Sequence, residues 1–186
     1  GATESEITYD IATRVEGRLL ALGASVFLTR GPQNDPTEQM RIKLTNDAHA
    51  DLMISLNCDS YKNENAHGVA TYSYGSDAHG IHSVVGDRFA SLVQREICAR
   101  TDLQDCGTHA KTWDLLRLVA APAIRIDLGY LTNPGDANRY QRAEFRDLIA
   151  ESLVIAIQRL YLAAEDDAKT GTLRISDLKR AGLRIN

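Results

Sequence analysis

The sequence has few cysteines, and they do not form a disulfide framework. The three of them, Cys58, Cys98 and Cys106, are an odd number, so at least one thiol stays free. We expect reduced and mostly buried thiols, while a Cys98–Cys106 bridge, which would close a short loop, stays open. Because no Cys-x-x-Cys occurs, a zinc site built from cysteines is not expected.

Long apolar runs and an excess of one charge are also missing. No stretch approaches the roughly 20 apolar residues of a membrane-spanning helix, and no basic-then-apolar signal peptide opens the chain. The chain has 21 Lys and Arg against 25 Asp and Glu, a net charge of −4, so we expect neither a membrane span nor nucleic-acid binding. A length of 186 residues with 44% hydrophobic residues fits one globular domain with a tail.

Helical patterns occur in four parts of the chain. Residues Thr3 to Glu6 have the Ser/Thr-x-x-Glu form of a capping box, which predicts that a helix begins there. Apolar residues follow at helical spacing as far as Leu22, and Gly23 suits the end of that helix. Further helices are expected over residues 37–49, about 81–100, and 143–164.

Short β-prone or apolar segments alternate with these helices. They predict strands over residues 25–30, 51–58, 68–74 and 123–130. The alternation indicates an α/β fold of three layers, with a central, mostly parallel sheet and helices on both faces. In such sheets ligands bind beyond the carboxyl ends of the strands, and residues 57–59 and 127–133 fall at such ends. The domain is expected to cover residues 1–162, with a polar tail over 163–186.

Several segments, taken in order, resemble the zinc-dependent N-acetylmuramoyl-L-alanine amidases of the amidase-3 type. They are ESEITYDIA at 4–12, LTR at 28–30, Arg41, ADLMISL at 50–56, Gly68-Val69, Leu116-Arg117, Pro122 and DLGYLTN at 127–133. Enzymes of this family cut the bond between muramic acid and the first alanine of the peptidoglycan stem. The resemblance implies the amidase fold over most of the chain and a peptidoglycan fragment or precursor as ligand. The altered site is most similar to that of a degenerate actinobacterial member.

The resemblance also identifies the expected site. The family binds zinc through a His in a Gly-His-Gly-Gly turn, a Glu and a second His, and uses a further Glu as general base. Glu4 matches the ligand Glu, while the first family strand with its turn would lie before Gly1 and is not in the chain. Asn57 stands in place of the second His, and Asp127 stands in place of the catalytic Glu.

These two substitutions weaken the expected metal site. A hydrolytic zinc site needs three imidazole, carboxylate or thiolate ligands and a water, and the neutral amide of Asn57 replaces imidazole poorly. Strand alternation turns Cys58 to the opposite face from Asn57. An oxygen-rich site of Glu4, Asn57 and Asp59 for a harder cation stays open but is not favoured. We therefore expect no metal cofactor, or zinc if the protein is an enzyme.

The acid itself is also changed. Asp127 is one methylene shorter than Glu, and a displacement of about 1 Å can cost on the order of 100-fold in rate. Arg125 lies two residues earlier on the same strand face, so its charge is expected to lower the pKa of Asp127 and to weaken it as a base. A structural ion pair between the two is the favoured interpretation.

Four other residues are candidates for the groove, each with a structural alternative. His109 and Trp113 precede the strand of Asp127. A structural role is favoured for His109, and Trp113 with Arg117 is as well explained by packing as by ligand contact. Arg41 suits a substrate carboxylate, although an ion pair with a nearby acid is favoured. The other histidines are His49, His67, His79 and His82. His79 and His82 have the i,i+3 spacing of one helix face, and all four are expected at the surface.

Two functions follow. The favoured one is a degenerate, catalytically inactive amidase-like protein that regulates or binds in cell-wall biosynthesis in the cytoplasm, with a protein partner at the groove or the tail. The alternative is an active or weakly active zinc amidase, which hydrolyses the muramoyl–alanine amide through Glu4 and Asp127. In the tail, Thr170 and Thr172 are candidate phosphorylation sites, since a phosphate adds roughly two negative charges, and an unmodified tail stays an equal alternative.

Overall fold

The structure, a computed structural model, describes residues 1–161. The expected tail, with Thr170 and Thr172, lies outside the described residues. The elements in chain order are α1 (Glu4–Ala21), α2 (Glu38–Asp47), β1 (Met53–Asp59), β2 (Val69–Ser76), the short 3-10 helix η1 (Asp77–His79), β3 (Ile81–His82), α3 (Val84–Arg100), β4 (Asp105–Lys111), α4 (Asp114–Leu118), β5 (Ala123–Tyr130), α5 (Pro134–Gln141) and α6 (Ala143–Leu160).

The strands form one mixed sheet. Its order is β1-β5-β2-β3, and β4 pairs with β2. The pairs β1–β5 and β2–β4 are parallel, whereas β2 runs antiparallel to β5 and to β3. The α/β class is confirmed, with a sheet that combines parallel and antiparallel pairs.

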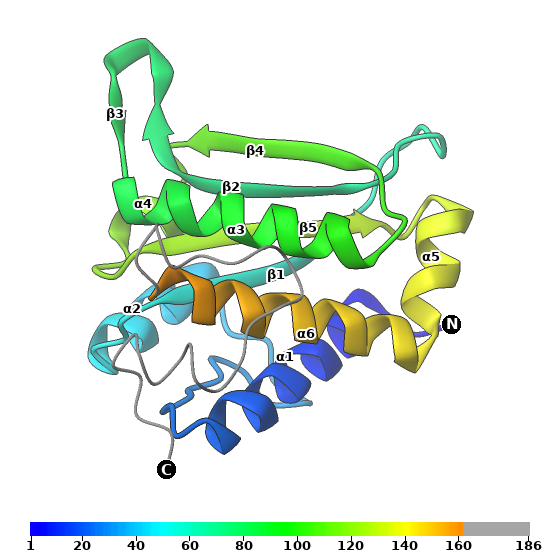
Figure 1. Ribbon diagram of the computed structural model, residues 1–186, viewed down its shortest axis with the longest axis horizontal. Coiled ribbons are helices and arrows are strands. Elements are labelled where there is room, and N and C mark those ends of the chain that lie inside the picture. The colour runs from blue at the N-terminus through cyan, green and yellow to red at the C-terminus, as the bar shows by residue number, and fades with distance from the viewer. Residues whose placement is uncertain (162–186) are drawn as a thin grey trace.

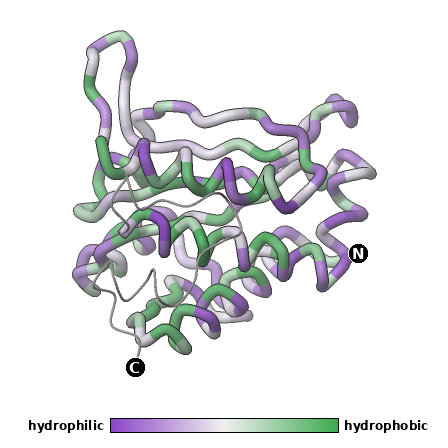
Figure 2. The backbone as a smooth tube through the Cα atoms, viewed as in Figure 1, coloured by the Kyte–Doolittle hydropathy of each residue, from purple (hydrophilic) through white to green (hydrophobic). Residues whose placement is uncertain are grey.

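Helices cover both faces of this sheet. Figure 1 shows α3, α6 and α1 side by side in that order, with α3 and α6 in front of the strands. Their inward side chains make the main core with the apolar face of β5, which contributes Ile124, Ile126 and Leu128. A smaller cluster on the other face joins Ile42 of α2 and residues of α4 to Met53 of β1. Figure 2 shows the hydrophobic residues gathered in the central elements, while α5 is mostly hydrophilic.

The first helix follows the sequence pattern closely. Thr3 N–H donates to Glu6 Oε2 (2.7 Å), and Glu6 N–H donates back to Thr3 Oγ1 (3.3 Å), so the predicted capping box is confirmed. Ile7 and Ile11 are fully buried on the inner face. The helix ends before Gly23, whose φ of 83° suits a residue without Cβ.

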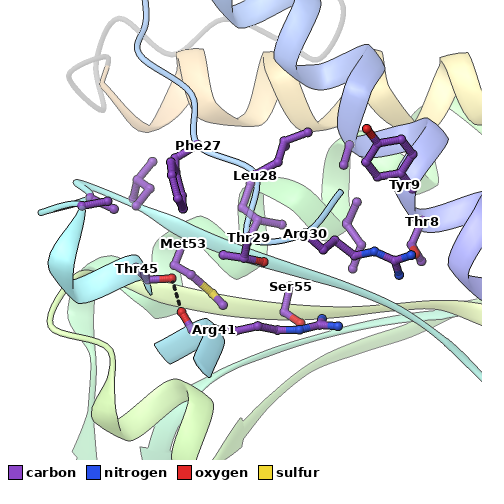
Figure 3. A pocket seen from close by; sticks show the side chains of 16 residues that line it. Thr8, Tyr9, Phe27, Leu28, Thr29, Arg30, Arg41, Thr45, Met53 and Ser55 are labelled. Carbon is purple, nitrogen blue, oxygen red and sulfur yellow. Dashed lines mark hydrogen bonds between the residues drawn. The ribbon is translucent and has the colours of Figure 1, made fainter. Parts of the chain in front are cut away.

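The strand predicted over residues 25–30 is wrong. Within residues 1–161 this segment pairs with no strand, and two adjoining hollows lie between it and the edge of β1 that faces away from β5. The larger hollow measures about 830 Å³. The smaller one is lined by Phe27 and Leu28 on one side and by Met53 and Ser55 of β1 on the other (Figure 3). A β-prone segment becomes a strand only where a neighbour takes its backbone hydrogen bonds.

Two other parts of the fold differ from the expectation. The helix predicted from about residue 81 begins at Val84, because Ile81–His82 form the short strand β3 instead. The sequence did not predict β4, an edge strand whose side chains are largely exposed and therefore lack the apolar pattern of a buried strand. A further helix, α5, follows β5, and the Asn133 side chain caps it by accepting from Asp136 N–H (3.0 Å).

Replacement of glycine by alanine is expected to change the free energy of unfolding in opposite directions at two positions. Gly68 has φ +104°, and a Cβ there would lie 2.5 Å from the Gln104 carbonyl oxygen, so Gly68→Ala should lower the free energy of unfolding by about 1–3 kcal/mol. Gly17, inside α1, has open space around the Cβ position, so Gly17→Ala should raise it by about 0.5–1 kcal/mol. Urea unfolding of both variants measures the difference, and equal stabilities would contradict the described backbone at Gly68.

Candidate functional site

The structure brings three of the candidate side chains to one edge of the sheet. Asn57 and Asp127 are direct neighbours in the parallel register of β1 and β5, near the carboxyl ends of both strands. Glu4, in the first turn of α1, accepts a hydrogen bond from Cys58 N–H through Oε1 (3.0 Å). The contact fixes the start of α1 beside the end of β1, so the two carboxyl groups and the amide share one small region.

The side chains there are engaged with protein partners. Asn57 Nδ2 donates to Ser55 Oγ (3.0 Å), and Asp127 Oδ1 accepts from Arg125 Nε (2.9 Å). The ion pair favoured from the sequence is therefore present. Asp59 uses Oδ1 to accept from Ser60 N–H (2.7 Å), and a register shift separates it from Asn57.

This donor set does not fit zinc well. Zinc sites in proteins favour imidazole and thiolate with carboxylate, whereas Glu4, Asn57 and Asp127 offer two carboxylates and a neutral amide. Across residues 1–161, no group of three or more His, Cys, Asp or Glu side chains is placed to hold a metal ion. Glu4, Asn57 and Asp127 thus do not by themselves supply the three strong ligands of a hydrolytic zinc site.

The pKa of Asp127 differs from the sequence-based expectation. Burial raises the pKa of this carboxyl above its usual value, and this outweighs the hydrogen bond and charge of Arg125, which lower it. Asp59 and Glu4 also raise the pKa of Asp127 through repulsion. The predicted contact with Arg125 is confirmed, but the predicted net lowering is wrong because desolvation is the larger effect.

This balance gives a testable prediction. Arg125→Gln should raise the pKa of Asp127 further, because the variant removes the partner that favours the ionised form. With a folded-state pKa above the unfolded one, the carboxyl stabilises the fold at pH below its unfolded pKa, and this contribution is lost as pH rises through its folded pKa. NMR titration of the Asp127 carboxyl carbon in both proteins measures the shift; an unchanged or lower pKa in the variant would contradict the ion pair.

The three cysteines are free thiols in different surroundings. Cys58 is buried in the main core, on the opposite face from Asn57 as predicted, and burial raises its pKa to about 12. Cys98 is half-buried, but Cys106 is exposed, contrary to the expectation of mostly buried thiols. The thiol of Cys58 is thus neither ionised nor aimed at the candidate site.

An aromatic–cation cluster lies next to Asp127. We give this name to Tyr72, His109, Lys111, Trp113 and Arg125. The Tyr72 ring centroid lies 4.8 Å from that of Trp113 and 5.5 Å from that of His109. The register places Tyr72 between its partners Arg125 of β5 and His109 of β4. Three sequence candidates thus meet here, and sequence reasoning missed Tyr72 and Lys111, although the alternation of Tyr72 and Tyr74 in β2 was a signal.

The other arginine candidates have local partners. Arg41 Nη2 lies 2.6 Å from Asp35 Oδ1, which matches the favoured ion pair, and Arg41 lines the hollow beside β1 (Figure 3). Arg117 Nη2 lies 2.7 Å from Asp114 Oδ1 within α4. Their contacts do not join them to Asp127.

The remaining histidines are at the surface, as predicted. All four are exposed, namely His49, His67, His79 and His82. His79 belongs to η1 and His82 to β3, so the one helix face expected from their spacing does not form.

Known proteins share this sequence and this arrangement of elements. The profile of a family described as N-acetylmuramoyl-L-alanine amidase matches residues 1–159. The N-acetylmuramoyl-L-alanine amidase CwlM of Mycobacterium tuberculosis is 41% identical over 176 residues, which cover 95% of this chain and 43% of that protein. The chain thus spans less than half the length of this relative.

Solved structures agree on the fold. The N-acetylmuramyl-L-alanine amidase Ami1 of Mycobacterium smegmatis superposes with a TM-score of 0.75 at 22% identity, covering 86% of this chain and 77% of Ami1. The CwlD amidase of Clostridioides difficile, solved in complex with the GerS lipoprotein, gives 0.73 at 18% identity, with 86% and 87% covered. Of the helices within residues 1–161, none has both the length and the apolar character needed to cross a membrane.

Proposed function

This chain belongs to the N-acetylmuramoyl-L-alanine amidase family, and we propose that it is a non-catalytic member that uses the former active-site face for binding. The ligand would be a peptidoglycan fragment or precursor, and the role would be regulation or binding in cell-wall biosynthesis. Members of the family are generally zinc-dependent, so the state of the metal site decides between binding and hydrolysis.

One observation carries this proposal. Asn57 and Asp127 stand side by side in the register, and each is engaged with a neighbouring protein side chain, Ser55 and Arg125 respectively. A neutral amide supplies no strong zinc ligand. A guanidinium paired with the acid supplies a positive charge where a metal cation would otherwise lie close by, which opposes cation binding.

The resemblance assigns the family's first strand to the region before Gly1, and the fold has space for such a strand. We propose that such a strand lies in the hollows between residues 25–30 and β1. Among the described residues β1 pairs with β5 alone, so its other edge can offer backbone groups to a further strand. Apolar side chains of both walls line the space. A His brought in by this strand would still meet Asn57 and Asp127 rather than a complete ligand set.

The alternative is a weakly active zinc amidase. It is supported by the two retained carboxyl groups, Glu4 and Asp127, and by the raised pKa of Asp127, which suits a general base better than an ordinary Asp does. The shortened side chain and its pairing with Arg125 count against this function.

A protein partner and the compartment are further parts of the proposal. The CwlD amidase was solved in complex with the GerS lipoprotein, which supports a protein partner at the groove or the tail here as well. The free thiols of Cys98 and Cys106 support a reducing compartment, the cytoplasm. Cell fractionation with an antibody to the protein tests this location.

Titration with soluble muropeptides that keep their muramoyl–alanine bond tests the function. We expect saturable binding, with the muropeptide recovered intact by chromatography after prolonged incubation with added zinc. Release of free stem peptide would support the enzyme instead. No binding at any accessible concentration would remove the cell-wall fragment as ligand.

A further inference from the structure

Two cations flank one exposed indole beside the candidate site. The guanidinium carbon of Arg125 lies 5.1 Å from the Trp113 ring centroid, and Lys111 Nζ lies 5.8 Å from it. Trp113 is 38% exposed and the Arg125 side chain is 32% exposed. The aromatic–cation cluster therefore presents two positive groups on an aromatic surface that solvent reaches.

The Nη1 and Nη2 groups of Arg125 are available to bind a ligand. Nε is held by Asp127 Oδ1 at 2.9 Å, and this contact fixes the orientation of the planar group. In the described part of the chain, Nη1 and Nη2 take part in no hydrogen bond, and Lys111 takes part in no ion pair. A guanidinium oriented in this way can bind a second, planar anion through two parallel hydrogen bonds.

The surrounding charges favour a carboxylate over a phosphate. Asp127 is bonded to Arg125, while Asp59 and Glu4 lie at the end of the neighbouring strand β1. Three acids therefore lie on this side of the cluster. A dianion would meet more repulsion there than a monoanion. A carboxylate also matches the two-pronged geometry of Arg, and the carbon skeleton next to it can pack on the Trp113 and Tyr72 rings.

We propose that the aromatic–cation cluster binds a carboxylate of the stem peptide. Arg125 contacts the carboxylate oxygens, Lys111 adds the second positive charge, and Trp113 with Tyr72 contacts the adjoining carbon skeleton. The inference rests on the proposed binding of cell-wall fragments and specifies which chemical group is recognised. In a zinc amidase the metal would polarise the scissile amide, whereas in this protein the group that is recognised is a carboxylate of the peptide.

Calorimetric titration with a matched pair of ligands tests this proposal. One ligand is N-acetylmuramoyl-L-alanyl-D-isoglutamine, which has one free carboxylate, and the other is the same compound with that carboxylate amidated. The unmodified protein should bind the acid about 10- to 100-fold more tightly than the amide, as expected for loss of charge-assisted hydrogen bonds. Acetate should compete more effectively than inorganic phosphate.

Variants assign the preference to the cluster. Arg125→Gln should abolish the preference for the acid, and Lys111→Gln should reduce it. Arg18→Gln is the control, because Arg18 is similarly exposed (35%) and pairs with Asp147, away from the cluster. Circular dichroism verifies that each variant folds, and the comparison of acid with amide on the unmodified protein needs no variant.

Each outcome decides a separate point. Tight binding of the acid, lost in Arg125→Gln and kept in Arg18→Gln, supports the proposal. Equal binding of acid and amide would overturn this proposal and leave the proposed function intact. A preference for the acid that survives in Arg125→Gln would have the same consequence. Stronger competition by phosphate would overturn the carboxylate assignment. Binding of neither ligand would overturn the proposed function together with this inference.

Discussion

The double variant Asn57→His, Asp127→Glu is expected to bind Zn²⁺ at least about 10-fold more tightly than the unmodified protein. The change adds an imidazole next to the acid at position 127 and lengthens that acid, which also alters its contact with Arg125. Even residues that only support metal ligands change affinity by about 10- to 100-fold, and a direct ligand should have no smaller effect. Competition with a zinc-sensitive dye measures the affinity.

A control variant separates this effect from nonspecific zinc binding. Gln39→His adds one imidazole to the exposed face of α2, away from Glu4 and Asp127, and should leave the zinc affinity nearly unchanged. Equal affinities of the double variant and the unmodified protein would show that Glu4 and positions 57 and 127 do not point toward a common centre.

Glu96→Ala is expected to lower the free energy of unfolding by about 3–5 kcal/mol. The Glu96 side chain is 0% exposed and its Oε1 lies 2.8 Å from Nε of the equally buried Arg159. Arg100 bonds to the same carboxylate. The substitution removes the acid that balances these cations between α3 and α6, and a buried charge without its counter-charge is costly. Guanidinium unfolding measures the loss.

An exposed ion pair provides the comparison. Asp102→Ala removes a pair with Arg139, but the Asp102 side chain is 74% exposed, so the cost should stay below about 1 kcal/mol. If Glu96→Ala cost no more than Asp102→Ala, the buried ion pair would not be an important contact between α3 and α6.

The sequence predicted best the elements whose signals are local. The capping box at Thr3 and the apolar run of β5, Ala123–Tyr130, were found with nearly correct bounds, because both depend on neighbouring residues. Residues 25–30 failed because a strand needs a partner that local sequence does not reveal. The edge strand β4 was missed because its side chains are mostly exposed.

In the candidate site, too, local features were predicted and contacts between distant segments were missed. The resemblance identified Asn57 and Asp127, and alternation correctly turned Cys58 away from them. Tyr72 was missed because its contacts with Trp113 and Arg125 join three separate elements. The direction of the Asp127 pKa shift was wrong because burial, which the sequence does not give, outweighs the charge of Arg125.

The zinc content of the purified protein tests the central claim most directly. The protein is equilibrated with excess Zn²⁺, freed of unbound metal by gel filtration and measured by inductively coupled plasma mass spectrometry. An amide at position 57 beside an arginine-paired Asp127 predicts far less than one zinc per chain. Nearly one zinc per chain, lost when Glu4 is replaced by Ala, would contradict the account.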